Sequence, residues 1–312
     1  MEYEKPRIEF YRQRTFSEKM NVIFEFIREN WRPLLKYSFY LIMPVCLIQT
    51  FSMNSFFDIY LNAIKNSAGE SPFNSSMYSV IANYGVMMLC MMIGTAIMSG
   101  LIYAMMQTYA TRENRLLDVS LDDFKDTLIR NIRKYISVII IIFFAYLFVV
   151  FAMISLAYIS TITLILTVPL LLVFVILLLP LMMIIPVYIF ERDLNITGAF
   201  KKAWKLGIAT LWGMLGLMII LYIISSVIQT ITMMPWYLTV VIGSVFSVAT
   251  ESTINQSVIY KFAIYILGLI QSFGMYISMI IGIIGLAFQY FHAREKVEGI
   301  TIESNISNFD KL

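Results

Sequence analysis

Residues 135–190 read YISVIIIIFFAYLFVVFAMISLAYISTITLILTVPLLLVFVILLLPLMMIIPVYIF, which is 56 positions without an Asp, Glu, Lys or Arg. At about 1.5 Å per residue, one helix of this length would far exceed the roughly 30 Å hydrocarbon core of a bilayer. The stretch therefore predicts a hairpin of two membrane-spanning helices. The polar cluster Ser160-Thr161-Ile162-Thr163 predicts the turn between them.

The remaining spans are bounded in the same way, because ionised side chains are costly in the middle of a membrane. Pro235-Trp236-Tyr237 is expected to break the run that starts at Leu206, which leaves Leu238–Thr250 as a short interfacial or re-entrant helix. With the hairpin, the total is six spans. The four single spans are predicted between Lys36 and Asp58, from about Met77 to Tyr109, from Leu206 to about Met234, and from Phe262 to Ala293.

Composition agrees with an integral membrane protein. Apolar residues make up 59% of the chain and charged residues 14%, whereas a soluble domain has about a quarter charged. Cys46 and Cys90 lie in apolar runs and are expected to act as small hydrophobes. The single histidine, His292, excludes a multi-histidine metal site within one chain, and no metal or cofactor is expected. A net charge of +3 does not suggest nucleic acid.

The placement of Lys and Arg predicts the topology. Six spans put 21 of the 23 basic residues on one side and leave only Lys65 and Lys261 on the other. The positive-inside rule then predicts that the N- and C-termini are both cytoplasmic. The first 30 residues are charged and amphipathic, so the first span is expected to be an uncleaved signal anchor.

Each pair of spans follows a similar amphipathic segment, and these segments begin at Ser17, Ser120 and Ile196-Thr197. Apolar residues recur at helical spacing with basic residues opposite them, which is typical of a helix lying in the interface. Each pair also ends in a Tyr followed by an Arg and an acid: Tyr109/Arg112/Glu113, Tyr188/Arg192/Asp193 and Tyr290/Arg294/Glu295. The predicted fold is therefore all-α, a single membrane domain over 1–312. It has three repeats, each an interfacial amphipathic helix plus a helical hairpin, at about 17–113, 120–193 and 197–295, and a short cytoplasmic tail at 296–312.

Aligning the terminal arginines brings small residues of spans two and six to matching depths. Rows of small residues allow helix backbones to approach closely in lipid. Spans two, four and six are therefore expected to form the inner layer and the others the outer layer. The expected packing residues are Ala96, Gly100, Pro180, Gly274, Ser278 and Gly282.

The stretch Glu191-Arg-Asp-Leu-Asn-Ile-Thr-Gly-Ala-Phe-Lys-Lys-Ala-Trp-Lys-Leu206 resembles a group of bacterial six-helix inner-membrane proteins. That group is similar to YciC-like proteins and to the membrane domain fused to some glycerophosphodiester phosphodiesterases. The opening, Phe10-Tyr-Arg-Gln-Arg-Thr-Phe-Ser-Glu-Lys-Met-Asn, is similar to a variant found in Bacteroidetes. The resemblance implies a multi-pass protein of the bacterial inner (cytoplasmic) membrane. The phosphodiesterase activity is not carried over, because it belongs to a separate soluble barrel for which this chain has no room.

These patterns favour a non-enzymatic protein that interacts with lipid, or with a partner membrane complex, in envelope organisation. One reading is that the arginines ring the cytoplasmic mouth and bind an anionic headgroup, and the other is that they are topology anchors in interfacial ion pairs. The candidate headgroup contacts are Arg112, Arg192, Arg294, Lys201, Lys202 and Arg133.

Three alternatives remain open. The first is a transporter or channel for an apolar or amphipathic solute, with Pro169, Pro180 and Pro186 kinking span four beside a polar pathway. Copper(I) transport through the methionine pairs is a second, although no Cys or His accompanies them in a copper-site pattern. A lipid-modifying enzyme using Asp58, Glu70 or Glu251 is the third, but these acids are scattered.

Overall fold

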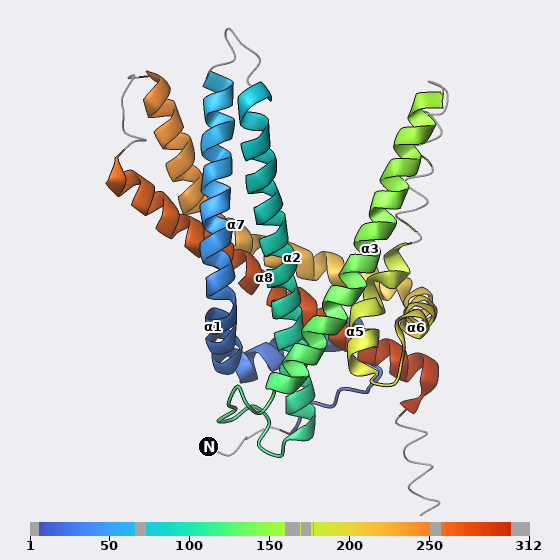
Figure 1. The fold of residues 1–312 in the computed structure, drawn as a ribbon. Coiled ribbons are helices and arrows are strands. Elements are labelled where there is room, and N and C mark those ends of the chain that lie inside the picture. Colours follow the sequence, from blue (N-terminus) through green and yellow to red (C-terminus); the bar gives the residue numbers. More distant parts are fainter. Residues whose placement is uncertain are drawn as a thin grey trace, which may run out of the picture. The chain divides into compact units, whose positions relative to one another are not determined.

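The computed structural model describes residues 6–65, 73–159, 169, 176, 178–249 and 257–300, and within them the chain is all-α (Figure 1). Five of the described helices are long and apolar enough to cross a membrane, namely α1, α2, α3, α7 and α8. These five helices indicate a multi-pass membrane protein. The bounds are α1 Phe16–Lys65, α2 Phe73–Thr111, α3 Lys125–Ile159, the 3-10 helix η1 Leu179–Met183, α5 Ile184–Phe190, α6 Ile196–Ala209, α7 Leu211–Ala249 and α8 Val258–Glu298.

The predicted sixth span, which is the second arm of the Tyr135–Phe190 hairpin, falls largely on residues outside the described set. So does the predicted turn at Ser160–Thr163. The continuous described part of that arm is the short apolar segment Leu179–Phe190, formed by η1 and α5. The structure therefore shows five long apolar helices, and the sixth crossing stays a prediction.

The predicted break at Pro235 is wrong, because α7 continues through this proline to Ala249. Proline costs a helix one backbone hydrogen bond, but packing can hold the helix together across it. Here the next residue, Trp236, is buried and its indole N–H donates to Asn54 Oδ1 at 3.0 Å. The Thr239 hydroxyl also donates to the Pro235 carbonyl at 2.8 Å. The carbonyl of the proline itself therefore has a side-chain partner.

The three amphipathic segments are all helical, but each joins its span differently. In α1 the backbone of Asn30 leaves helical geometry, so a kink separates the segment from the span. In α3 the segment and the span form one helix, whereas α6 is a separate helix that ends before Thr210. The three segments are therefore similar in sequence but differ in how the backbone connects each one to its span.

None of the three helices is capped by the Ser or Thr at which its amphipathic segment begins in the sequence. Ahead of α1, the Thr15 backbone N–H donates to the Glu18 carboxylate at 2.7 Å, and the Glu18 N–H donates back to the Thr15 hydroxyl. This is a capping box centred two residues before Ser17. The α6 cap is Asn195, whose side chain accepts from the Gly198 N–H at 2.9 Å. Helix α3 begins at Lys125, after a turn at Asp122–Phe124, rather than at Ser120.

The described chain forms two compact units, and α1, α2, α7 and α8 contribute to both. The first unit consists of residues 1–31, 99–221 and 281–312. In it α6 lies against η1 and α5, and α5 lies against α3 (Figure 1). An aromatic cluster fills the space between its segments: Phe10, Phe26, Tyr109, Phe288 and Phe291.

The second unit consists of residues 32–98 and 222–280. One hydrophobic cluster of this unit consists of Trp236 with Met53 and Val240, and Phe57 meets the Trp236 ring edge-on at 5.0 Å between centroids. Uncharged polar groups are paired inside this unit. The Thr50 and Ser272 hydroxyls lie 3.1 Å apart, for example.

The six expected packing residues have different surroundings. Ala96 and Ser278 are buried, and the Ser278 hydroxyl donates to the Met275 carbonyl. A Cβ at Gly100 would meet Ile132 of α3 at 2.6 Å, and one at Gly274 would collide with Thr232 of α7. Pro180 lies against Gly207 of α6, where a Cβ would collide with the proline carbonyl. Gly282 has nothing within 4 Å of the Cβ position.

Burial of the long helices agrees only partly with the expected layers. In their most hydrophobic windows α2 and α8 are each 44% buried, whereas α7 is 17% and α3 only 6% buried. Helix α1, which was expected outside, is 39% buried and so resembles α2 and α8. Its apolar length contacts neighbouring helices that the repeat pattern did not indicate.

Candidate functional site

Four charged side chains of the first unit form a closed ring. Glu191, which ends α5, accepts from Lys202 of α6 at 2.7 Å. Lys202 also lies 2.8 Å from Glu298, and Glu298 accepts from Arg294 of α8 at 2.9 Å. Arg294 closes the ring at 3.7 Å from Glu191. Two acids and two bases give a net charge of zero, and the side chains are only 10–25% exposed.

Two tyrosines extend this ring towards the N-terminal segment. The Tyr290 hydroxyl donates to Glu191 at 3.0 Å, and Arg294 donates to the Tyr290 and Tyr11 oxygens, both at 3.2 Å. Burial raises the pKa of Tyr11, although the nearby Arg294 acts in the opposite direction. Tyr11 therefore stays a neutral phenol at physiological pH and serves as an acceptor for the guanidinium.

The N-terminal segment 6–15 is attached to the ends of α2 and α8. Arg7 donates to the Tyr109 and Arg112 carbonyls, where a cation stabilises the C-terminal end of α2. The Arg14 backbone N–H donates to His292 Nδ1 at 3.0 Å, so this nitrogen carries no proton. Burial lowers the pKa of the Arg14 side chain. The one histidine of the chain thus has a structural hydrogen bond.

A second charged group lies around Glu29 of α1. Its carboxylate accepts from Arg115 at 2.8 Å and from the Tyr109 hydroxyl at 3.2 Å. Arg115 is buried in the loop after α2, with a φ of 51°, a conformation that non-glycine residues seldom adopt. The pair and the buried aromatic cluster hold that loop against α1.

The arginines expected to form one ring have three different sets of neighbours. Arg112 pairs with Asp123 at 2.7 Å, and Arg294 belongs to the Glu191 ring. Arg192 is exposed and lies near enough to Arg130 and Lys134 to interact electrostatically with both. Arg112 and Arg294 form ion pairs outside their own motifs. Their partners Asp123 and Glu298 come from a loop and from the next helical turn.

Of the lysines and Arg133 in the expected set, Lys202 is part of the ring, whereas Lys201 and Arg133 are exposed. Lys134, which was not in that set, donates to the Tyr188 and Glu191 carbonyls at the end of α5. The expected contacts therefore divide into bases used inside the protein and bases that face outward.

The outward bases of α6 share a face with large apolar residues. Lys201, Trp204, Lys205 and Ile208 are all exposed, and they recur at the spacing of one helical turn. The opposite face is buried through Ala199, Ala203 and Leu206. Small residues there let α6 lie close to η1, which turns the bulky and basic residues outward.

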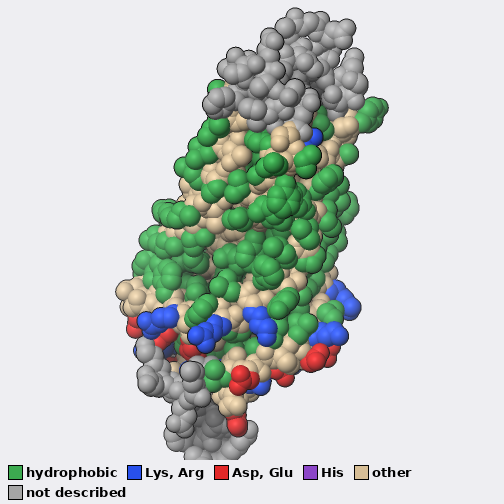
Figure 2. Space-filling view, turned by 90° about the vertical axis from the view of Figure 1, so that its left-hand side faces the viewer, with side chains coloured by type: hydrophobic (Ala, Val, Ile, Leu, Met, Phe, Trp, Pro, Cys, Tyr) green, Lys and Arg blue, Asp and Glu red, His purple; other side chains and the backbone are tan. Residues whose placement is uncertain are grey.

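Helices α1 and α3 present similar faces. On the part of α1 that belongs to the first unit, Phe24, Arg28 and Trp31 are exposed. Figure 2 shows hydrophobic side chains over most of one face of the molecule, and Lys and Arg side chains gathered in a row beside Asp and Glu. On α3 the exposed residues are Lys125, Ile129, Arg133 and Ile136. We call these three surfaces the basic–apolar faces.

Sequence reasoning missed Glu191, Glu298, Glu29 and Tyr11 as partners of the bases. A signal existed for Tyr109 and Tyr290, which stand before each terminal arginine and which both contact a carboxylate from another helix. Nothing in the local sequence indicates which carboxylate that is. Among the described residues, no cluster of three or more His, Cys, Asp or Glu could hold a metal ion.

Comparisons with models of known protein families, with curated proteins and with solved structures give no match for this chain. The resemblance to six-helix inner-membrane proteins therefore stays a prediction.

Proposed function

We propose that this protein is a non-enzymatic, multi-pass inner-membrane protein that binds anionic lipid headgroups through its three basic–apolar faces. The observation that carries the proposal is the orientation of α6, which buries its small residues and exposes Lys201, Trp204 and Lys205. A Trp between two lysines suits the boundary between acyl chains and headgroups. Each basic residue near an anionic surface contributes about 1 kcal/mol.

The neutral ring around Glu191 is less suited to a headgroup phosphate than the exposed lysines of α6. Its two bases already face two carboxylates, so a headgroup phosphate would have to displace these acids. Lys201 and Lys205 are exposed next to apolar side chains and need no such exchange. We therefore propose that the headgroup contacts lie on the basic–apolar faces. The ring of Glu191, Lys202, Arg294 and Glu298 then has a structural role. The alternative occupant of the same faces is a membrane-protein partner in envelope organisation.

The test compares Lys201→Gln/Lys205→Gln with the charge-preserving Lys201→Arg/Lys205→Arg in purified protein titrated with phosphatidylglycerol. The first double variant should bind fewer anionic lipids by native mass spectrometry, by up to the share of one of the three faces, because two cations of that face are lost. The second should bind like the unmodified chain. Equal lipid binding by the Gln and Arg variants, with equal thermal stability, would refute the proposal.

A further inference from the structure

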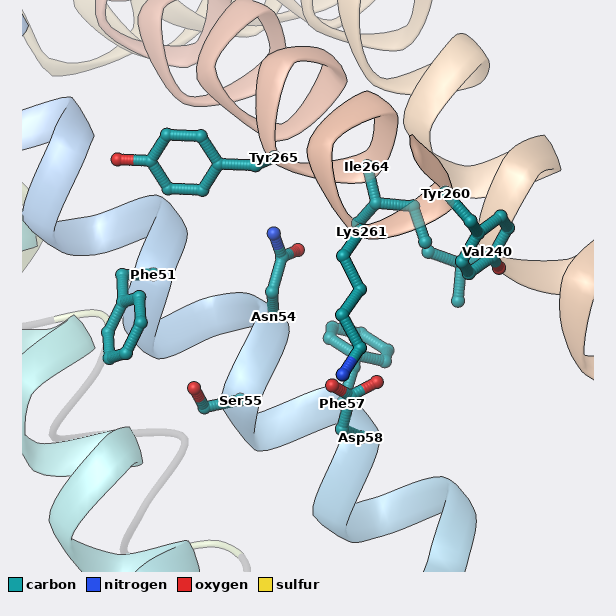
Figure 3. A pocket seen from close by; sticks show the side chains of 10 residues that line it. All are labelled: Phe51, Asn54, Ser55, Phe57, Asp58, Val240, Tyr260, Lys261, Ile264 and Tyr265. Carbon is teal, nitrogen blue, oxygen red and sulfur yellow. The ribbon is translucent and has the colours of Figure 1, made fainter. Parts of the chain in front are cut away.

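A cavity of about 220 Å³ opens in the second unit, where α1, α7 and α8 meet (Figure 3). Its walls are mostly apolar, and its polar groups are Asn54, Ser55, Asp58 and Lys261. Pockets that combine apolar walls with a few convergent polar groups are the usual form of small-ligand sites. The apolar and aromatic wall consists of Phe51, Phe57, Val240, Tyr260, Ile264 and Tyr265.

Opposite charges meet at this cavity. Asp58 comes from α1 and Lys261 from the first turn of α8, and in Figure 3 the Lys261 amino group points towards the Asp58 carboxylate. Both residues are exposed. A ligand can therefore reach a positive and a negative group side by side.

A row of polar residues along α1 includes two residues that line the cavity, Asn54 and Asp58. Thr50, Asn54 and Asp58 recur every four residues and so share one face of the helix. Asn54 is held by the Trp236 indole and Thr50 by Ser272, and a Cβ at Gly268 would meet Thr50 at 2.7 Å. Only the cavity end of this row, at Asp58 and Lys261, carries charge.

We propose that this cavity binds the headgroup of a zwitterionic phospholipid that carries a primary amine. The phosphate lies at Lys261 and the ammonium at Asp58, while the start of an acyl chain lies against Phe51 and Ile264. A cavity of this volume is of headgroup size, and it lies at the ends of two candidate spans, where headgroups are found. The site is independent of the basic–apolar faces.

The charge pattern selects among phospholipids. A singly anionic headgroup would satisfy Lys261 but leave Asp58 facing negative charge, which is a repulsive element against it. A primary ammonium donates hydrogen bonds to the Asp58 carboxylate, and such charge-assisted bonds are strong. A choline headgroup has no N–H to donate. The expected order is phosphatidylethanolamine, then phosphatidylcholine, then phosphatidylglycerol.

Trp236 can report on the site, because its indole contacts the cavity residue Asn54 and its ring contacts Phe57. The other three tryptophans, Trp31, Trp204 and Trp212, are exposed and can be replaced by Phe. The single-Trp236 protein is placed in nanodiscs of constant composition that contain a small fraction of one brominated lipid. Brominated phosphatidylethanolamine should quench Trp236 at least twofold more than brominated phosphatidylcholine or phosphatidylglycerol.

Lys261→Gln and Asp58→Asn should each remove this preference, whereas Lys296→Gln, an exposed lysine of the same helix, should keep it. Ser55→Phe fills the cavity without changing its charges and should also lower quenching to the phosphatidylcholine level. An excess of soluble phosphoethanolamine should lower the quenching by brominated phosphatidylethanolamine, because it carries the same phosphate and ammonium, and a lack of competition would overturn recognition of the headgroup. Equal quenching by all three lipids in the single-Trp236 protein would overturn the proposal.

Discussion

The two compact units treat buried polar groups in opposite ways. The first unit pairs full charges, as in the ring of Glu191, Lys202, Arg294 and Glu298. Inside the second unit the pairs are uncharged, such as Thr50 with Ser272 and Gln49 with the Tyr276 hydroxyl. Its Asp58 and Lys261 are exposed at a cavity mouth.

This difference agrees with what it costs to bury each kind of group. Removing an ion from water costs several kcal/mol, and a partner repays the cost only in good geometry and with further hydrogen bonds. The charged ring is still 10–25% exposed, so its ions keep part of their hydration. Hydroxyl and amide pairs cost less to bury in hydrocarbon and contribute correspondingly less.

The largest effect should follow from breaking the charged ring. Glu191→Gln removes the acid that Lys202, Arg294 and Tyr290 share, so two partly buried bases then depend on Glu298. We expect a loss of about 2 kcal/mol, below the figure for a fully buried pair because water still reaches the ring. Thermal unfolding in detergent measures it. The control is Asp193→Asn, an exposed acid two residues away that should change little.

A smaller effect is expected for a hydroxyl pair of the second unit. A double-mutant cycle of Thr50→Val and Ser272→Ala should give a coupling free energy of about 0.6 kcal/mol, since hydrogen bonds inside membranes average about that value. The measurement is unfolding of the two single variants and the double variant. A coupling free energy as large as the loss of stability expected for Glu191→Gln would contradict the proposed contrast between the units.

The smallest effect concerns the loop before α3. The Ser120 N–H and then Arg112 lower the pKa of Asp123, an exposed acid. Because the folded pKa lies below the unfolded one, this stabilisation is complete above the unfolded pKa and is lost as pH falls through the folded pKa. Hydrogen exchange at the Ser120 amide should therefore accelerate, after correction for intrinsic rates, only at pH well below 4. In Asp123→Asn the faster exchange should be present at neutral pH, and no change there would contradict the expectation.

Much of the fold could be predicted from local pattern. Uncharged runs located five helices that the structure describes as long and apolar, and the amphipathic segments at Ser17, Ser120 and Ile196 are helical. Helix α7 passes through Pro235 because Trp236 and Asn54 bond across the unit, which no local rule contains. The same limit applies to the site. Lys201 and Arg133 are exposed, whereas Arg112 and Arg294 form ion pairs with Asp123 and Glu298, which the local sequence did not indicate.

Apolar length and the placement of charge by themselves determined that this chain is built for a membrane, because hydrocarbon penalises each ionised residue wherever its neighbours lie. Tertiary structure alone decided which acid meets which base, and which face of α6 is buried. A carboxylate has a favourable contact with any base that packing brings within about 4 Å, and distance along the chain does not enter that energy. Glu191 and Arg294, 103 positions apart, meet for this reason.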